Sequence, residues 1–266
     1  MKYYGLIGYP LSHSFSKKYF AEKFKKENIT DAVYDNYPLE DIKDLQDLLD
    51  DNPELRGLNV TVPHKKNVLR YLDWIEHDAR KAGAVNCLRI RKESPVLAAF
   101  SGEVGVKDHD FRIEGYNTDL YGFEMSLKPL IKRHHDTALI LGDGGAAQAV
   151  KCILENLEIP FRVVTRKAQG SNILFKDLKP HHITQHPIII NTTPVGTAPN
   201  IDECPDIPYE AITGKHLLYD LIYNPDKTLF LQKGEGQGAI IKNGYEMLLL
   251  QAEKSWEIWN SRELHP

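Results

Sequence analysis

Cysteine is scarce in this chain, and the three copies form no recognisable binding pattern. Cys87, Cys152 and Cys204 are odd in number and widely spaced, whereas zinc sites and disulfide frameworks use paired or closely spaced cysteines. This usage fits a reducing compartment, so we expect a cytoplasmic protein. The histidines near His182 and His186 lie between two prolines, where a shared helix face is unfavourable, so we expect no metal site.

Long apolar runs and an excess of basic residues are missing as well. The longest apolar runs, such as Pro187–Ile190 and Met247–Leu250, fall far short of the roughly 20 residues that cross a bilayer. The residues after Met1 contain no apolar stretch of the signal-peptide type. Lysine and arginine number 33 against 37 aspartates and glutamates, a net charge of -4. We therefore expect neither a membrane nor a nucleic-acid partner.

The chain does contain a regular alternation of short apolar runs and helical patterns. Its 266 residues, 42% apolar and 26% charged, suit a globular protein of one large or two modest domains. The predicted strands are the apolar runs Tyr3–Ile7, Val33–Tyr37, Leu58–Val62, Thr137–Leu141, Arg162–Val164, Pro187–Ile190, Leu217–Leu221 and Ala239–Ile241. The predicted helices between them include Ser16–Glu27, Leu39–Asp50, Trp74–Ala82, Asp119–Lys132 and Ala146–Asn156. This alternation predicts an α/β fold with mainly parallel sheets.

Two further segments have patterns of their own. Near the end of the chain Tyr245, Leu248, Ala252 and Trp256 fall on one helical face, which predicts a final helix that docks on a domain. The segment Lys92–Glu114 alternates weakly around a Ser-Gly turn and predicts a long β-hairpin.

A glycine-rich turn joins one predicted strand to the following helix. Gly142, Asp143, Gly144, Gly145 and Ala146 follow the strand directly, and such a turn lets a pyrophosphate approach amides at the positive helix end. A plain strand-to-helix turn is the alternative, but the order strand, glycines, helix favours a dinucleotide site. The carboxylate of Asp143 would repel a bound pyrophosphate unless its side chain points away from the ligand.

The next predicted strand ends in a basic run, Thr165, Arg166 and Lys167. Units that prefer NAD have an acidic residue about there, which binds the ribose 2′-hydroxyl. A basic run instead favours a 2′-phosphate and hence NADP, although a solvated pair of cations on a loop would look the same.

Polar residues follow the strands of the first half. Ser16 suits a helix N-cap, and hydroxyls at a helix N-terminus can also hold a carboxylate. Asn59 and Thr61 share one strand face, and Lys65 lies just past the strand end, where α/β sheets present functional groups. Taken singly, Lys65 is explained as a surface lysine and Asp119 as a helix cap.

Together these segments resemble the shikimate dehydrogenase family over almost the whole chain. The matching stretches follow the family's order and are Gly8–Ser14, Asn59–Lys65, Gly83–Asn86, Asn117–Asp119, Asn191–Gly196, Tyr219–Pro225 and Asn243–Met247 with Gln251–Ala252. Any one of them could arise by chance, whereas seven in the right order make coincidence implausible.

The resemblance implies roles for individual residues. Lys65 and Asp119 would be the catalytic pair. The implied substrate ligands are Ser14, Ser16, Asn59, Thr61, Asn86, Tyr223 and Gln251. The implied cofactor-binding residues are Gly142, Gly144, Gly145, Ala146, Thr165, Arg166, Lys167, Thr192 and Gly244.

The resemblance also implies a fold and an activity. Residues 1–118 with 243–266 would form an α/β substrate-binding domain and residues 119–242 an NADP-binding Rossmann domain, with a cleft between them. The implied reaction is the reversible NADPH-dependent reduction of 3-dehydroshikimate to shikimate in aromatic amino-acid biosynthesis, by a monomer or homodimer. An enzyme that uses quinate with NAD, and a catalytically silent dinucleotide-binding homologue, remain alternatives.

Three features depart from the family pattern. Asp143 replaces a small residue, and Thr165 stands where asparagine usually precedes the arginine. Both bear on the affinity for the cofactor. The segment between Asn86 and Asp119 is over a dozen residues longer than usual, so the position of Asp119 assumes an inserted hairpin.

Overall fold

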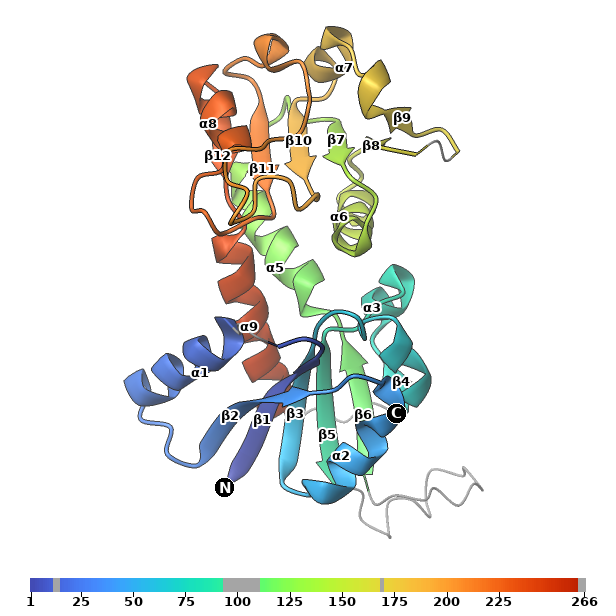
Figure 1. Ribbon diagram of the computed structural model, residues 1–266, viewed down its shortest axis with the longest axis vertical. Helices are drawn as coiled ribbons and strands as arrows, with labels where there is room; N and C mark the ends of the chain where they lie inside the picture. The colour runs from blue at the N-terminus through green and yellow to red at the C-terminus, as the bar shows by residue number, and fades with distance from the viewer. Residues whose placement is uncertain (12–14, 93–110, 168–169, 263–266) are drawn as a thin grey trace. The chain divides into compact units, whose positions relative to one another are not determined.

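The computed structural model describes residues 1–11, 15–92, 111–167 and 170–262, which form two compact units. Unit 1 comprises Met1–Thr118 and Ala252–Pro266, and unit 2 comprises Asp119–Gln251. The chain passes between the units twice, once at the start of helix α5 (Thr118–Leu127) and once within helix α9 (Tyr245–Asn260) (Figure 1).

The sheet of unit 1 is mixed. Its strands are β1 (Lys2–Gly8), β2 (Ala32–Pro38), β3 (Leu55–Val60), β4 (Trp74–Ile75), β5 (Cys87–Lys92) and β6 (Phe111–Tyr116). They lie in the order β2-β1-β3-β5-β6-β4. Strand β1 is parallel to β2 and β3, whereas β5 is antiparallel to both β3 and β6. The carboxyl ends of β1 and β3 therefore meet at one edge of the sheet.

Helices cover both faces of this sheet. They are α1 (Phe15–Lys26), α2 (Leu45–Asp51) and α3 (His77–Ala82), with the short 3-10 helices η1 (Ile42–Asp44) and η2 (Asn67–Tyr71). One core is aliphatic and joins α2 and α3 to the sheet. The other is aromatic and joins α1 to the end of α9, with Phe20 stacked on Tyr34 at 4.5 Å and Tyr4 on Trp259 at 4.9 Å between ring centroids.

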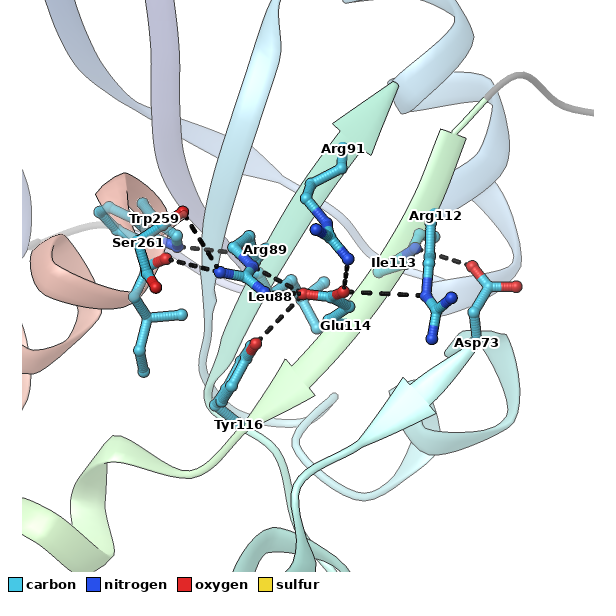
Figure 2. A network of polar contacts seen from close by, with 11 residues as sticks. Asp73, Leu88, Arg89, Arg91, Arg112, Ile113, Glu114, Tyr116, Trp259 and Ser261 are labelled. Atoms are coloured by element: carbon cyan, nitrogen blue, oxygen red, sulfur yellow. Dashed lines mark hydrogen bonds and ion pairs between the residues drawn. The ribbon is translucent and has the colours of Figure 1, made fainter. Parts of the chain in front are cut away.

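A buried ionic network fixes the end of α9 to this sheet (Figure 2). Arg89 Nε donates to Glu114 Oε2 at 2.6 Å, and Arg91 also pairs with this carboxylate, which is completely buried. Arg89 Nη1 reaches the carbonyls of Ile258 and Ser261 at 3.4 and 3.5 Å, at the negative end of the helix. Arg89 thus joins the sheet to the last turn of α9, which belongs to unit 1.

The sheet of unit 2 is entirely parallel. Its strands are β7 (Ala138–Leu141), β8 (Phe161–Thr165), β9 (Ile173–Leu174), β10 (Ile188–Asn191), β11 (Leu217–Asp220) and β12 (Ile240–Lys242). The order β12-β11-β10-β7-β8-β9 reverses direction between β7 and β10. In a doubly wound sheet ligands bind at the carboxyl ends of the strands beside such a reversal.

Helical segments connect these strands. They are η3 (Lys128–Leu130), α6 (Gly145–Asn156), η4 (Phe175–Asp177), α7 (Pro180–Thr184), η5 (Tyr209–Ala211) and α8 (Leu229–Gly236). Unit 2 also contains most of α5 and the first part of α9, as far as Gln251. Gly122 allows α5 and α9 to pack closely within unit 2, because an added Cβ there would lie 2.5 Å from the carbonyl of Met247.

The α/β class predicted from the sequence is confirmed, while some element assignments were wrong. The predicted helix Trp74–Ala82 divides into β4 and α3, because Trp74 and Ile75 pair with β6. The predicted helix Leu39–Asp50 becomes η1 followed by α2. The arms β5 and β6 of the predicted hairpin are antiparallel, and residues 93–110 between them lie outside the described residues. Among the residues described, no helix has the length and apolarity needed to span a bilayer.

Candidate active site

The glycine turn of unit 2 is shaped by close contact with the neighbouring strand end. Gly142 has φ of 103°, which favours glycine, and an added Cβ would lie 2.8 Å from Thr193 Cγ2 and 2.9 Å from Thr192 Oγ1. Helix α6 then begins at Gly145 with Gly144 as its N-cap. The first amides of α6 are thus placed at the carboxyl end of β7, where they can bind an anion.

A cavity of about 610 Å³ opens at this turn, whereas two cavities in unit 1 have volumes of about 340 and 300 Å³. It brings together most of the predicted cofactor residues, namely Gly142, Gly144, Thr165, Arg166, Lys167 and Thr192. Sequence reasoning missed the rest of its wall, formed by Phe175, Thr193, Pro194, Val195 and Cys204–Asp206. Only residues 191–196 carried a signal, as part of a family-like stretch.

Three predicted cofactor residues are not in this wall. Gly145 and Ala146 are exposed at the start of α6, next to the lining residues. Gly244 has a packing role, because an added Cβ would lie 2.1 Å from the carbonyl oxygen of Leu221. A glycine there lets the start of α9 approach the end of β11.

The end of β8 presents two cations to the cavity. Thr165 is buried, and its hydroxyl donates to the carbonyl of Lys167 at 2.6 Å, which closes a short turn. Arg166 and Lys167 are exposed on that turn and line the cavity. Thr165, which departs from the family's asparagine, therefore shapes the turn that presents the basic side chains.

The carboxylate of Asp143 lies in the same wall, and it is not isolated. It forms an ion pair with Lys151 of α6, and Asn172 Nδ2 donates to its second oxygen at 3.4 Å. An ion-paired carboxylate repels an anion much less than a bare one.

A buried carboxylate, Asp220, holds the strand ends beside the cavity. Asp220 is completely buried and accepts from Asn191 Nδ2 at 3.0 Å, Thr228 Oγ1 at 2.6 Å and the Ile222 amide at 3.1 Å. Asn191 Oδ1 in turn accepts from the amide and hydroxyl of Thr193. The turn that brings Thr193 to the cavity is thus tied to the turn after β11.

Burial raises the pKa of Asp220 to about 6 from 3.8, against the lowering effect of its hydrogen bonds. The folded state therefore holds this proton more tightly than the unfolded state, so stability is lost as pH rises from about 4 through 6. A shift of this size amounts to about 3 kcal/mol.

We expect Asp220→Asn to abolish this fall in the free energy of unfolding between pH 4 and 7. Urea unfolding at the two pH values measures it, and Asp202→Asn, a change at an exposed aspartate, is the control. An Asp220→Asn variant with the pH dependence of the parent would contradict the prediction.

In unit 1, Lys65 lies in the turn after β3. The backbone of this turn is held firmly, because the Lys65 carbonyl accepts from the Val85 amide at 2.8 Å and His64 Nε2 lies 2.6 Å from the Leu39 carbonyl. Lys65 itself is half-buried, and Thr61 directly follows the strand. The two predicted residues are therefore presented at the carboxyl edge of the unit 1 sheet.

The predicted serines lie at the start of α1. Ser14 is outside the described residues. Ser16 is not the helix cap that the sequence suggested, because α1 begins at Phe15 and Ser16 lies in its first turn. The side chain of Ser16 forms a hydrogen bond with the Tyr34 hydroxyl.

Asn59 and Asn86 belong to one buried polar cluster. Asn59 Oδ1 accepts from Tyr34, and its Nδ2 donates to Ser255 Oγ at 2.9 Å and to the Asn86 carbonyl at 3.3 Å. Asn86 Oδ1 accepts from the amide and hydroxyl of Thr118. Both polar atoms of the Asn59 carboxamide have a protein partner, so the side chain is held in place, and its Oδ1 can accept a second hydrogen bond.

The remaining candidates belong to unit 2. Asp119 is the second residue of α5, so it is not the cap that was the alternative explanation. Tyr223 follows β11 and is 42% exposed, and Gln251 is half-buried on α9. In the part of the chain that is described, no three potential metal ligands come together.

Comparisons with known proteins agree with this arrangement. Residues 6–88 match the family described as the shikimate dehydrogenase substrate binding domain. A shikimate dehydrogenase (NADP(+)) of Clostridium beijerinckii is 36% identical over 99% of this chain and 94% of its own. The structure of shikimate 5-dehydrogenase from Thermus thermophilus, in complex with NADP(H) and shikimate, has a TM-score of 0.78 at 25% identity over 98% of this chain and 94% of that one. The 5-ketofructose reductase of a Gluconobacter strain has a TM-score of 0.79 at 27% identity, covering 99% and 94%.

Proposed function

The chain belongs to the shikimate dehydrogenase family, and on that premise we propose that it reduces 3-dehydroshikimate to shikimate with NADPH, reversibly. It is an NADP-dependent oxidoreductase acting on a secondary CH–OH group. The observation that carries the proposal is the cavity of about 610 Å³, in which a glycine turn faces two cations. The fold alone would not suffice, since a structural neighbour is named for a different substrate.

Unit 2 has the features needed to hold the cofactor. The α6 amides beside Gly144 suit a pyrophosphate, and Arg166 with Lys167 suits a ribose phosphate. When bound, the nicotinamide accepts or delivers the hydride. Glycine at 142 is required by the close approach to Thr192 and Thr193, which supports a turn built for a ligand rather than an incidental one.

Lys65 and Asp119 are assigned to proton transfer. When a hydride leaves the carbon of a secondary alcohol, the hydroxyl proton must leave as well, so a base has to lie within hydrogen-bond reach of that oxygen. We assign this task to the pair Lys65 and Asp119, with Lys65 as the base. The fixed backbone on both sides of Lys65 supports the assignment, because a proton-transfer group must be held in place.

The remaining side chains are assigned to substrate recognition. Ser14, Ser16, Thr61 and Tyr223 would hold the carboxylate, and Asn86 and Gln251 the ring hydroxyls. The carboxamide of Asn86 is held in place, because its Oδ1 accepts hydrogen bonds from the amide and hydroxyl of Thr118. Asn59, whose carboxamide is held by Tyr34 and Ser255, would likewise bind a ring hydroxyl.

Replacing Ser14 and Ser16 together with alanine is expected to raise the KM for shikimate far more than it lowers kcat. A carboxylate remote from the reacting carbon contributes mainly uniform binding, and one charge-assisted hydrogen bond is worth roughly ten- to a hundredfold in affinity. Steady-state kinetics measure both constants. The control is Thr30→Ala, which removes an exposed hydroxyl elsewhere in unit 1. A fall in melting temperature with unchanged KM would show that the hydroxyls are only structural.

The activity itself is tested by following formation of the reduced cofactor, NADPH from NADP or NADH from NAD, with shikimate and with quinate as substrate. We expect shikimate with NADP to be the best combination. Faster turnover of quinate with NAD would favour the alternative dehydrogenase. A folded protein that binds dinucleotide but turns over none of these combinations would be a silent homologue.

A further inference from the structure

The glycine turn carries a carboxylate in the wall of a cavity assigned to an anionic cofactor. Asp143 lies between Gly142 and Gly144, and all three residues line the cavity together with Arg166 and Lys167. A ribose phosphate adds about 1.5 to 2 negative charges at neutral pH. A bare carboxylate in this wall would therefore lower the affinity for NADP more than the affinity for NAD. It would thus reduce the preference for NADP that Arg166 and Lys167 create.

The contacts of Asp143 remove this conflict. Lys151 pairs with Oδ1, Gln148 Nε2 donates to the same oxygen at 3.5 Å, and Asn172 Nδ2 donates to Oδ2 at 3.4 Å. Lys151 and Gln148 project from α6, and Asn172 directly precedes β9. Both carboxylate oxygens are thus held by donors from outside the turn.

Burial makes the ion pair stronger than an ordinary surface pair. The side chains of Asp143 and Lys151 are only 18% and 21% exposed, so solvent screens them incompletely. Lys151 is not part of the cavity wall. Its charge therefore reaches a ligand chiefly through its effect on Asp143.

We propose that Lys151 sets the preference for the phosphorylated cofactor from outside the cavity, by neutralising Asp143 and holding its carboxylate in place. The inference rests on the cofactor assignment made above. Lys151 is a positioning residue in this scheme, since it acts through Asp143 and does not contact the cofactor. The aspartate that departs from the family pattern is accepted at the turn because this lysine accompanies it.

The test is a double-mutant cycle on binding, read by calorimetric titration with NADP and with NAD. The variants are Lys151→Met, which keeps the length of the side chain, Asp143→Ala, and the two combined. Lys151→Met should raise the Kd for NADP about tenfold, equivalent to about 1.4 kcal/mol, and the Kd for NAD by less than about threefold. The double variant should regain the parent Kd for NADP. Lys227→Met, which breaks an exposed ion pair with Glu235 in the same unit, should change neither.

The outcomes separate this inference from the cofactor assignment. If the parent binds neither dinucleotide, the cofactor assignment fails and the inference fails with it. If the parent prefers NADP but Lys151→Met weakens both dinucleotides equally, or if removing Asp143 does not restore binding, only the role of Lys151 is overturned. If Lys151→Met lowers the melting temperature but leaves the ratio of the two Kd values unchanged, the pair of Asp143 and Lys151 contributes to stability alone. That result would also overturn the proposed role of Lys151.

Discussion

Lys65→Ala is expected to lower kcat for shikimate oxidation by about 10²–10⁴-fold, the usual worth of a positioned proton-transfer group. The alcohol proton would then have no acceptor at the moment the hydride leaves. Binding of shikimate should weaken much less, because the backbone of the turn is held by Val85 and Leu39 independently of the lysine side chain. Steady-state kinetics and a shikimate titration separate the two effects.

A matched control lies next to it in the chain. Lys66 is exposed and begins η2 as its N-cap residue, so Lys66→Ala removes the same charge from the same turn. We expect it to leave kcat within about twofold of the parent, as for a surface substitution away from the chemistry. Equal kinetics in the two variants would make Lys65 an ordinary surface lysine.

Arg166→Ala is expected to abolish the preference for NADP. A guanidinium pairs with a phosphate through two parallel hydrogen bonds, whereas NAD leaves the same side chain solvated. The loss of a charge-assisted bond corresponds to roughly ten- to over a hundredfold in kcat/KM for NADP. The efficiency with NAD should be largely kept, so the informative quantity is the ratio of kcat/KM for the two cofactors.

Arg162 offers the comparison for this variant. It is an exposed arginine on β8, the strand that directly precedes Arg166, and its Nη2 donates to the Ser171 carbonyl at 3.4 Å. It is not part of the cavity wall, so Arg162→Ala should leave the ratio unchanged. Equal use of the two cofactors by the parent, or a ratio that survives the loss of Arg166, would contradict the assignment of the phosphate to this residue.

Unit 2 was predictable from sequence to a larger extent than unit 1, and the reason is burial. In a parallel sheet covered on both faces, strands are continuous apolar runs, and Leu139–Leu141 and Ile188–Ile190 are completely buried. Short runs of this kind are typical of strands in a parallel sheet. By contrast, Trp74 and Ile75 form a strand only because β6 lies beside them, and local pattern cannot anticipate a two-residue pairing.

The candidate site divides in the same way. Residues of the glycine turn and of the end of β8 were predictable because their neighbours in sequence are also their neighbours in the cavity. Cys204–Asp206 reach the wall through a long loop after β10, whose path no local signal determines. The hydrogen bond from Asn59 to Ser255, 196 residues further along the chain, was not predictable either. No local pattern shows which distant residue a polar side chain on a strand will contact.

The attachment of the last helix also determines the order in which the molecule is completed during synthesis. Residues 1–118 of unit 1 precede unit 2 in the chain, but the aromatic core of unit 1 needs Ile258 and Trp259. Its buried arginine, Arg89, also bonds to the carbonyls of Ile258 and Ser261. Domains fold as units, normally with the amino-terminal one first. Here the continuous segment Asp119–Gln251 is finished earlier. A chain interrupted directly after Gln251 would thus carry all of unit 2 and an unfinished unit 1.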